Sequence, residues 1–176
     1  MDVLEHLTQE HRQVEAMLEQ LKTSEPGSQR DRLVDELIGA VTKHMRIEEH
    51  FLYPLVIDVV GEEPEEEAET EHDLAREGLV KLDTLRDEPG FGAVVDMVAA
   101  GIAHHVHEEE QEVFPQLRSK ASDQLAKLDP DQLETQLGAL DLSKQELLEQ
   151  ARKAGVPGRS QMTKEELAEA VAAKTR

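Results

Sequence analysis

Apolar residues recur every three or four positions along almost the whole chain, which is the spacing of one face of an α-helix. Leu4, Leu7, Val14, Leu18 and Leu21 form the first such stripe. No segment alternates apolar and polar residues with the period of two that a half-buried strand requires. The pattern therefore predicts an all-α protein.

Turn-forming residues divide this pattern into four long helices. A Pro-Gly pair ends the first helix, and Ser28 is placed to cap the second. Gly61 ends the second helix, Pro64 opens the third within its first turn, and another Pro-Gly pair ends the third. Short connections favour antiparallel neighbours. We therefore expect an antiparallel up-down-up-down four-helix bundle over residues 1–121.

The remaining residues have a different organisation. We expect a linker with one short helix over residues 122–142 and a small helix–extended–helix module over residues 143–176. Two capping boxes mark the starts of the module's helices: Ser143 with Glu146, and Thr163 with Glu166. The first of these helices should end at Gly155, and Val156–Ser160 should be extended.

Charge narrows the range of partners. The chain has 19 Lys and Arg against 39 Asp and Glu, a formal net charge of −20, which argues against a surface that binds nucleic acid or an anionic membrane as a whole. Residues 144–176 carry +2 and the rest −22. The acidic run at residues 62–67 suits the positive end of a helix dipole, and we interpret it as a solvated helix start.

Composition excludes further classes of protein. The chain has no Cys, so disulfides, iron–sulfur clusters and thiol chemistry are excluded. No apolar run approaches the roughly 18 residues of a membrane span, and the first residues do not resemble a secretion leader. We therefore expect a cytoplasmic protein with no membrane partner.

Six residues interrupt the apolar stripes at positions where helical phase points into the bundle: His11, His44, Glu48, His72, His105 and Glu109. They repeat, because an offset of 61 residues relates His11 to His72, His44 to His105, Glu48 to Glu109 and Pro54 to Pro115. Burying two carboxylates is costly unless positive charge compensates them. A metal site would supply that charge.

The donor set restricts the metal. Without Cys, structural zinc loses its commonest ligand, and calcium and magnesium prefer shells of oxygen alone. Imidazole mixed with carboxylate suits iron, manganese or zinc. Bundles can hold two metals between facing helices, so each ion would take two His, with Glu48 and Glu109 bridging both. An oxo or hydroxo bridge would then leave an open position for a small molecule.

The paired His-x-x-x-Glu-Glu segments, each followed by an aromatic-Pro pair, resemble the hemerythrin-like, HHE cation-binding domain over residues 1 to about 120. The resemblance implies a four-helix bundle with two iron ions in a non-haem centre, held by the six residues named above. Oxygen-carrying hemerythrins have a further His four residues after the third-helix ligand, where this chain has Arg76. The ligand set of four His and two Glu is more similar to that of repair-of-iron-centres proteins and of bacterial hemerythrin-like proteins that react with nitric oxide or peroxide.

Other residues near the expected ligands have weaker patterns. Tyr53 lies about 140° from Glu48 around a straight α-helix, which favours packing or a surface hydrogen bond over ligation by its phenolate. Glu69 and Glu71 could reach an open metal position or relay protons, although solvation is favoured. Arg76 could pair with a carboxylate near the site. The remaining histidines are expected at the surface: His6, His50, His104 and His107.

The segment 144–171 resembles the helix–extended–helix of Rho N-terminal and SAP-type modules. That resemblance implies nucleic-acid contact through Arg152, Lys153, Arg159 and Lys164. The rest of the chain would repel phosphates, so a docking or dimerisation role is the favoured alternative.

The donor set and the resemblance to the hemerythrin-like domain together imply a non-haem di-iron protein that binds or reduces dioxygen, hydrogen peroxide or nitric oxide, with electrons from an unidentified donor. It would then be an oxidoreductase that consumes peroxide or nitric oxide. The alternative is iron binding without turnover, for sensing, storage or the repair of iron centres. A third hypothesis is a metal-free acidic bundle whose buried His and Glu satisfy one another.

Overall fold

The computed structural model describes residues 1–141 and 144–174, which form helices and turns without any strand. The all-α prediction therefore holds over these two ranges. The chain divides into two compact units, Met1–Lys127 and Leu128–Arg176. In the described residues, none of the helices combines the length and apolar character that crossing a bilayer requires.

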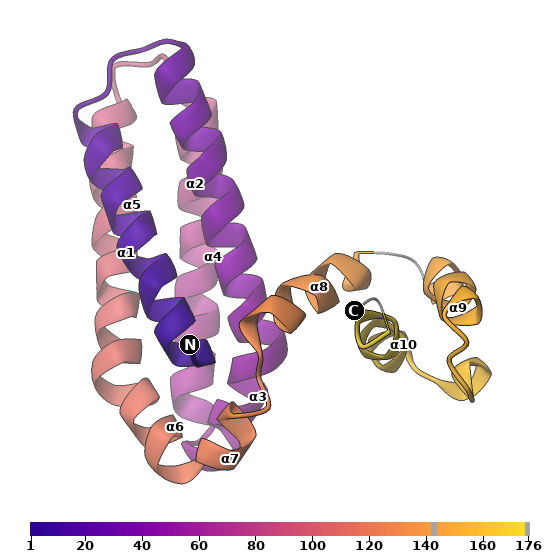
Figure 1. The fold of residues 1–176 in the computed structure, drawn as a ribbon. Helices are drawn as coiled ribbons and strands as arrows, with labels where there is room; N and C mark the ends of the chain where they lie inside the picture. The colour runs from indigo at the N-terminus through magenta and orange to yellow at the C-terminus, as the bar shows by residue number, and fades with distance from the viewer. Residues whose placement is uncertain (142–143, 175–176) are drawn as a thin grey trace. The chain divides into compact units, whose positions relative to one another are not determined.

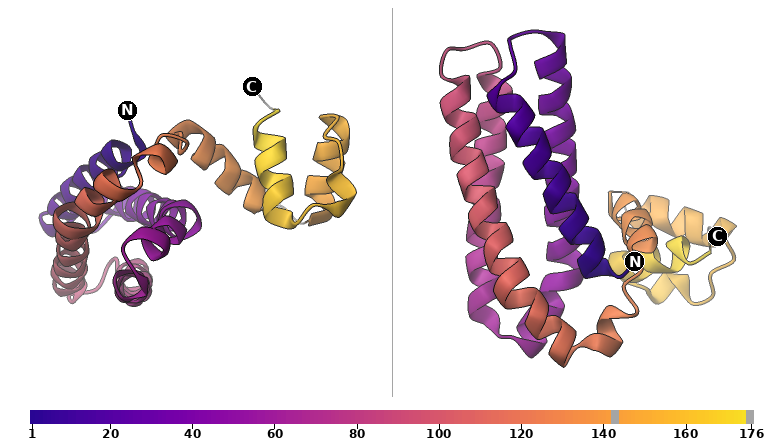
Figure 2. Two further views of the ribbon diagram at one scale, coloured as in Figure 1. Left: turned by 90° about the horizontal axis from the view of Figure 1, so that it is seen from below. Right: turned by 60° about the vertical axis from the view of Figure 1, so that its left-hand side comes forward.

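Four long helices lie side by side in the first unit (Figure 1, Figure 2). They are α1 (Val3–Lys22), α2 (Ser28–Ile47), α4 (Glu62–Thr84) and α5 (Phe91–Glu108). Helix α1 packs against α2 and α5, and α4 packs against the same two helices. Three short helices lie near one end of this bundle: α3 (Tyr53–Val59), between α2 and α4 in the chain, and α6 (Phe114–Lys120) and α7 (Ser122–Leu125), after α5.

Local sequence explains where the long helices begin. Asp2 and Glu5 form a capping box at the start of α1. The expectation that Ser28 caps the second helix is wrong, because Ser28 is the first helical residue and Gly27 is the N-cap. Gly27 has φ 133° and Gly61, which precedes α4, has φ 137°, a conformation that a side chain would oppose.

Two π-helical turns interrupt the helices that follow the His-x-x-x-Glu segments. Glu48–Leu52 joins α2 to α3, and Glu109–Val113 joins α5 to α6 at the equivalent place in the repeat. Each turn comes just before Pro54 or Pro115, which has no N–H to donate and whose ring would collide with the carbonyl of a regular preceding turn. A wider turn avoids that collision.

One hydrophobic cluster in the core of the first unit is mostly aliphatic and includes Phe91, while Tyr53 and Phe114 are also buried in this unit. The cluster is built from all four long helices, and its members include Leu18, Leu37, Leu82 and Ile102. Polar and charged residues are buried in the same unit: Glu10, His11, Arg30, His44, Glu48, His72, His105 and Glu109. All six residues that interrupt the apolar stripes are therefore inside the bundle.

The second unit contains α8 (Pro130–Leu140), α9 (Lys144–Lys153), a 3-10 turn (Arg159–Gln161) and α10 (Lys164–Ala172). Helix α10 packs against α8 and α9 around buried aliphatic residues that include Leu147 and Leu167. The helix expected within a linker is thus a packed part of this unit.

Two details of this unit were foreseen and one was not. The capping box of Thr163 and Glu166 is present, whereas Ser143 lies outside the described residues. The chain leaves α9 through Gly155, as expected. The expectation that Val156–Ser160 is extended is wrong, because Gly158 has φ 70° and turns the chain into the 3-10 turn.

Candidate metal centre

Each long helix contributes one buried imidazole to the interior of the bundle. The Nε2 atoms of His11 (α1) and His44 (α2) are 3.0 Å apart, and those of His72 (α4) and His105 (α5) are 3.3 Å apart. The four rings thus form two pairs whose Nε2 atoms converge. Neutral imidazole nitrogens arranged in this way are the commonest protein ligands of transition metals.

Glu48 lies between the two imidazole pairs and is fully buried. Its Oε1 is 2.8 Å from Nε2 of His44 and 4.0 Å from Nε2 of His11. Its Oε2 is 3.3 Å from Nε2 of His72 and 3.9 Å from Nε2 of His105. Each carboxylate oxygen therefore faces a different pair.

Glu109 faces the same space from the second π turn. Its Oε2 is 3.4 Å from Nε2 of His11 and 3.6 Å from Nε2 of His105, one from each pair. Its Oε1 accepts a hydrogen bond from the Tyr53 hydroxyl at 3.2 Å. Both carboxylates expected between the imidazoles are therefore found there.

Three buried oxygens in this cluster accept no hydrogen bond from any described residue: Oε1 and Oε2 of Glu48 and Oε2 of Glu109. Buried carboxylate oxygens without a donor are costly, and a bound cation would compensate them. Within this cluster, two groups have ligand atoms within 4.8 Å of one another, namely His11, His44, Glu48 and Glu109, and Glu48, His72 and His105. The residues present therefore fit metal ions, and Glu48 belongs to both groups.

A carboxylate holds the outer nitrogen of every one of these imidazoles. The Nδ1 to carboxylate oxygen distances are 2.8 Å for His11 with Glu110, 2.9 Å for His44 with Glu10, 2.8 Å for His72 with Glu49 and 2.9 Å for His105 with Glu71. A proton shared with the carboxylate at Nδ1 leaves the lone pair of Nε2 directed into the cluster. This arrangement is typical of His residues that bind metals.

The sequence interpretation missed Glu10, Glu49 and Glu110, and it favoured a solvated Glu71. Glu71 is half-buried and holds His105, so that preference is wrong, whereas Glu69 is exposed. The repeat contained the necessary information, because the offset of 61 also relates Glu10 to Glu71 and Glu49 to Glu110. Each of them is adjacent in sequence to one of the six expected ligands.

Each of the four carboxylates that hold the imidazoles also lies close to a basic side chain. Arg12 contacts Glu110 and Arg76 contacts Glu49. Lys43 Nζ is 2.6 Å from Oε1 of Glu10, and His104 Nε2 is 3.4 Å from Oε1 of Glu71. Arg76, which stands where oxygen carriers have a further His, thus supports the carboxylate that orients His72.

Tyr53 is buried in the cluster, although a straight α-helix would place it about 140° from Glu48. Its backbone N–H bonds to the carbonyl of Glu48, five residues earlier, and this wider turn brings Tyr53 back over Glu48. Its hydroxyl is 3.1 Å from Nε2 of His72. In the repeat Tyr53 corresponds to Phe114, which stacks on His11, so a hydroxyl is present beside only one of the two pairs.

Electrostatics in the cluster favour charged pairs when no metal is bound. Burial lowers the pKa of His44 and His105, but the carboxylates of Glu48, Glu10, Glu109 and Glu71 outweigh it and raise these pKa values to about 10 and about 11. Burial opposes ionisation of Glu48, yet His44 and His105 bring its pKa well below the usual value. Burial and the carboxylates of Glu48 and Glu109 raise the pKa of the Tyr53 hydroxyl.

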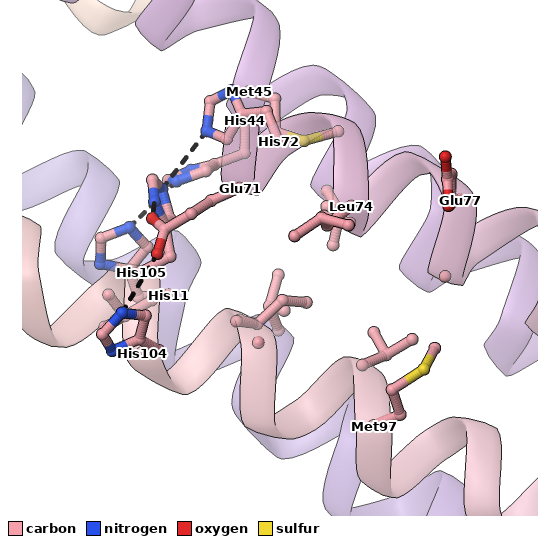
Figure 3. Close-up of a pocket in the computed structure, with 18 of the residues that line it drawn as sticks. His11, His44, Met45, Glu71, His72, Leu74, Glu77, Met97, His104 and His105 are labelled. Atoms are coloured by element: carbon pink, nitrogen blue, oxygen red, sulfur yellow. Dashed lines mark hydrogen bonds and ion pairs between the residues drawn. The ribbon is translucent and has the colours of Figure 1, made fainter. Parts of the chain in front are cut away.

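Two cavities reach this cluster. The larger, about 350 Å³, has mostly aliphatic walls on α1, α2, α4 and α5 and ends at the four imidazoles (Figure 3). Leu74 and Met97 lie along it and are 62% and 48% exposed, so apolar side chains continue to the surface. The smaller, about 280 Å³, is lined largely by carboxylates and includes Tyr53, His105 and Glu109.

The remaining histidines are not among the imidazoles that converge in the cluster. His50, His104 and His107 are exposed, and His6 is half-buried with its Nε2 3.4 Å from Oε1 of Glu10. In the second unit, Arg152 and Lys153 end α9, Lys164 opens α10, and Arg159 donates a hydrogen bond to the Val156 carbonyl at 3.1 Å.

Comparisons with known proteins agree with this geometry. The hemerythrin HHE cation-binding domain matches residues 2–117. An uncharacterized hemerythrin-like protein from Schizosaccharomyces pombe is 26% identical over 119 residues, and the match covers 65% of this chain and 59% of that relative. No solved structure has significant similarity to the chain. Because the domain match covers well over half of its residues, the chain belongs to the hemerythrin HHE cation-binding family.

Proposed function

We propose that this chain is a non-haem di-iron protein that binds or reduces a small oxidant, with dioxygen, hydrogen peroxide and nitric oxide as the candidates. The observation that carries the proposal is Glu48, a buried carboxylate whose two oxygens accept no hydrogen bond of suitable geometry and face different imidazole pairs. One ion would be held by His11 and His44 and the other by His72 and His105, with Glu48 and Glu109 shared. Bound iron would supply electrons by passing between its ferrous and ferric states.

The protein's own groups would orient the centre and distinguish its two ends. Glu10, Glu49, Glu71 and Glu110 keep the four Nε2 lone pairs directed inward. The Tyr53 hydroxyl gives the end at His72 a hydrogen-bond donor, while Phe114 gives the end at His11 an apolar wall. We therefore propose that the small molecule binds at the end held by His72 and His105, two imidazoles that the aliphatic cavity reaches.

The aliphatic cavity favours an uncharged ligand. Glu71, Glu77, Lys81 and His104 are its polar lining residues besides the four imidazoles, and the others are apolar, so a neutral molecule loses less solvation on entering than an ion would. Dioxygen, nitric oxide and hydrogen peroxide are all uncharged at neutral pH. The cavity therefore supports an uncharged small molecule as the ligand, a condition that all three candidates meet.

The second candidate function is iron binding without turnover, in a sensor, a store or a protein that repairs iron centres. The carboxylate-lined cavity favours it, because this cavity offers a cation its own way to Glu109. Peroxide consumption by the iron-loaded protein, compared with release of iron to a chelator, separates the two functions.

We also propose an order and direction for the four long helices. An up-down-up-down antiparallel order of α1, α2, α4 and α5 is supported by the pairwise packing of these helices and their short connections. We propose a cytoplasmic protein, in keeping with a centre that exchanges iron and electrons with cellular partners.

Replacement of one His in each pair tests the ligand assignment. In the His44→Ala/His105→Ala protein each ion would lose one of its two imidazoles, so we expect most of the iron to be lost. The control is His50→Ala/His107→Ala, which removes two exposed imidazoles that lie outside the cluster. Iron per folded chain is measured for both, and retention of two irons by the first variant would reject the assignment.

A further inference from the structure

The carboxylate-lined cavity lies beside the expected metal centre and is distinct in character from the aliphatic one. Helix α4 contributes Glu63, Glu67 and Glu71 to its wall. Glu108, at the end of α5, and Glu112, in the second π turn, lie along the opposite wall. A volume of about 280 Å³ is ample for a cation together with water molecules.

The carboxylates that line this cavity lie at different depths below the surface of the bundle. Glu63, Glu67 and Glu71 are four residues apart, so they share one face of α4 as a row along its axis. The outer members Glu63, Glu67 and Glu112 are exposed, and the inner members Glu71 and Glu108 are half-buried. The two rows therefore run from solvent towards the interior of the bundle.

The inner end of the cavity is part of the cluster. Glu109 lines it, is 3% exposed, and has an Oε2 that accepts no hydrogen bond from the described residues. His105 and Tyr53 line the same end. A cation that passed the outer carboxylates would thus meet an unpaired buried carboxylate oxygen and an imidazole.

We propose that this cavity is the route by which divalent iron moves between solvent and the His–Glu centre. The inference rests on the proposed function, since it concerns how the centre is loaded and emptied. Rows of like charge beside low-dielectric walls concentrate counter-ions, and carboxylate oxygens suit a hydrated divalent cation. The aliphatic cavity has two carboxylates in its lining, Glu71 and Glu77, together with the opposing charge of Lys81, and it has no such row. We therefore assign the metal to the carboxylate-lined cavity and the uncharged ligand to the aliphatic one.

The proposal gives part of the acidic run at residues 62–67 a role beyond that of a solvated helix start. Glu63 and Glu67 line the cavity, whereas Glu62 and Glu66 are exposed and are not part of its wall. All four lie in the first turns of α4. The chain therefore contains a matched control for the loss of two charges at one helix terminus.

The test compares Glu63→Gln/Glu67→Gln with Glu62→Gln/Glu66→Gln in the full chain. Anaerobic stopped-flow measures the rate at which the metal-free protein takes up Fe²⁺, and a chelator assay measures the rate of release from the loaded protein. We expect the first variant to take up Fe²⁺ roughly tenfold more slowly than the second at low ionic strength, with a smaller difference at high salt. Release should slow as well, while the final iron content of both variants equals that of the wild type.

Equal rates in the two variants, with two irons bound by each, would overturn the route and leave the proposed centre standing. A wild-type protein that takes up no iron would overturn both the route and the proposed function. A fall in final iron content confined to Glu63→Gln/Glu67→Gln would also overturn the route, because the two carboxylates would then be ligands.

Discussion

At the scale of single residues, the cluster is defined by how each imidazole is held. Every one of the four has a carboxylate at Nδ1 and directs Nε2 inward. In a metal-free bundle whose buried groups only satisfied one another, unpartnered oxygens on Glu48 and Glu109 would not be expected. The arrangement of donors therefore favours a metal centre over a structural role.

Tyr53→Phe removes one hydroxyl and keeps the ring that stacks on His72. Because Glu109 Oε1 then loses this donor, we expect the metal-free protein to unfold with a free energy lower by about 1–3 kcal/mol. Urea titration of the metal-free wild type and variant measures the difference, and iron content should not change. Equal free energies of unfolding would mean that the hydroxyl does not stabilise Glu109.

The raised pKa values predict how stability of the metal-free protein depends on pH. His44 and His105 have pKa values of about 10 and about 11 in the folded chain, against 6.5 in the absence of these contacts. Their stabilisation is therefore complete below pH 6.5 and is lost as pH rises through 10 and 11. Denaturant titrations from pH 6.5 to 10.5 should show falling stability, and His44→Ala should flatten the decline. Rising stability over this range would contradict these charge states.

At the scale of elements, the two π turns decide which side chains reach the cluster. The helical periodicity of the sequence predicted His11, His44, Glu48, His72, His105 and Glu109 as inward residues, and all are buried. It failed for Tyr53, because five residues in an α-helix do not return to the same face whereas five residues across a π turn do. Pro54 and Pro115 were recognised in the repeat, but their effect on the preceding turn was not foreseen.

Deletion of His50 combined with Pro54→Ala, which removes the ring that would collide with a regular preceding turn, tests the π turn. A π turn contains one residue more than an α turn, so removing the exposed His50 should leave Tyr53 and Glu48 on one face of a regular helix. We expect this protein to retain the wild-type iron content. Deletion of the exposed Gly39 within α2 is the comparison, because it rotates His44 and Glu48 by about 100° relative to the preceding core residues and should abolish binding. Loss of iron in both deletions would contradict the prediction.

Gly101 on α5 tests the aliphatic cavity. It lines the cavity, and a Cβ at this position would meet no atom within 4 Å, so a larger side chain has room to enter. Gly101→Leu should slow the association of nitric oxide with the ferrous protein several-fold without changing iron content. Gly39→Leu, on an exposed face of α2 with equal space, should bind at the wild-type rate. Stopped-flow rates that are the same in both variants would reject this route.

At the scale of the whole molecule, the first unit consists of two related halves that meet at one cluster. The offset of 61 relates the ligands, the carboxylates behind them, the π turns and the residues Lys43 and His104. The sequence shows which residues of the two halves correspond, but it does not show which carboxylate contacts which imidazole. Glu10 holds His44 rather than its neighbour His11, and such a contact between helices depends on packing that periodicity does not specify.

The most direct test of the central claim is the metal content of the full-length protein purified after growth in iron-replete medium, with its optical spectrum before and after peroxide. We predict about two irons per chain and a spectrum that peroxide changes. Zinc, or no metal, in the folded protein would contradict the di-iron centre and would leave the cluster of His and Glu with a different role.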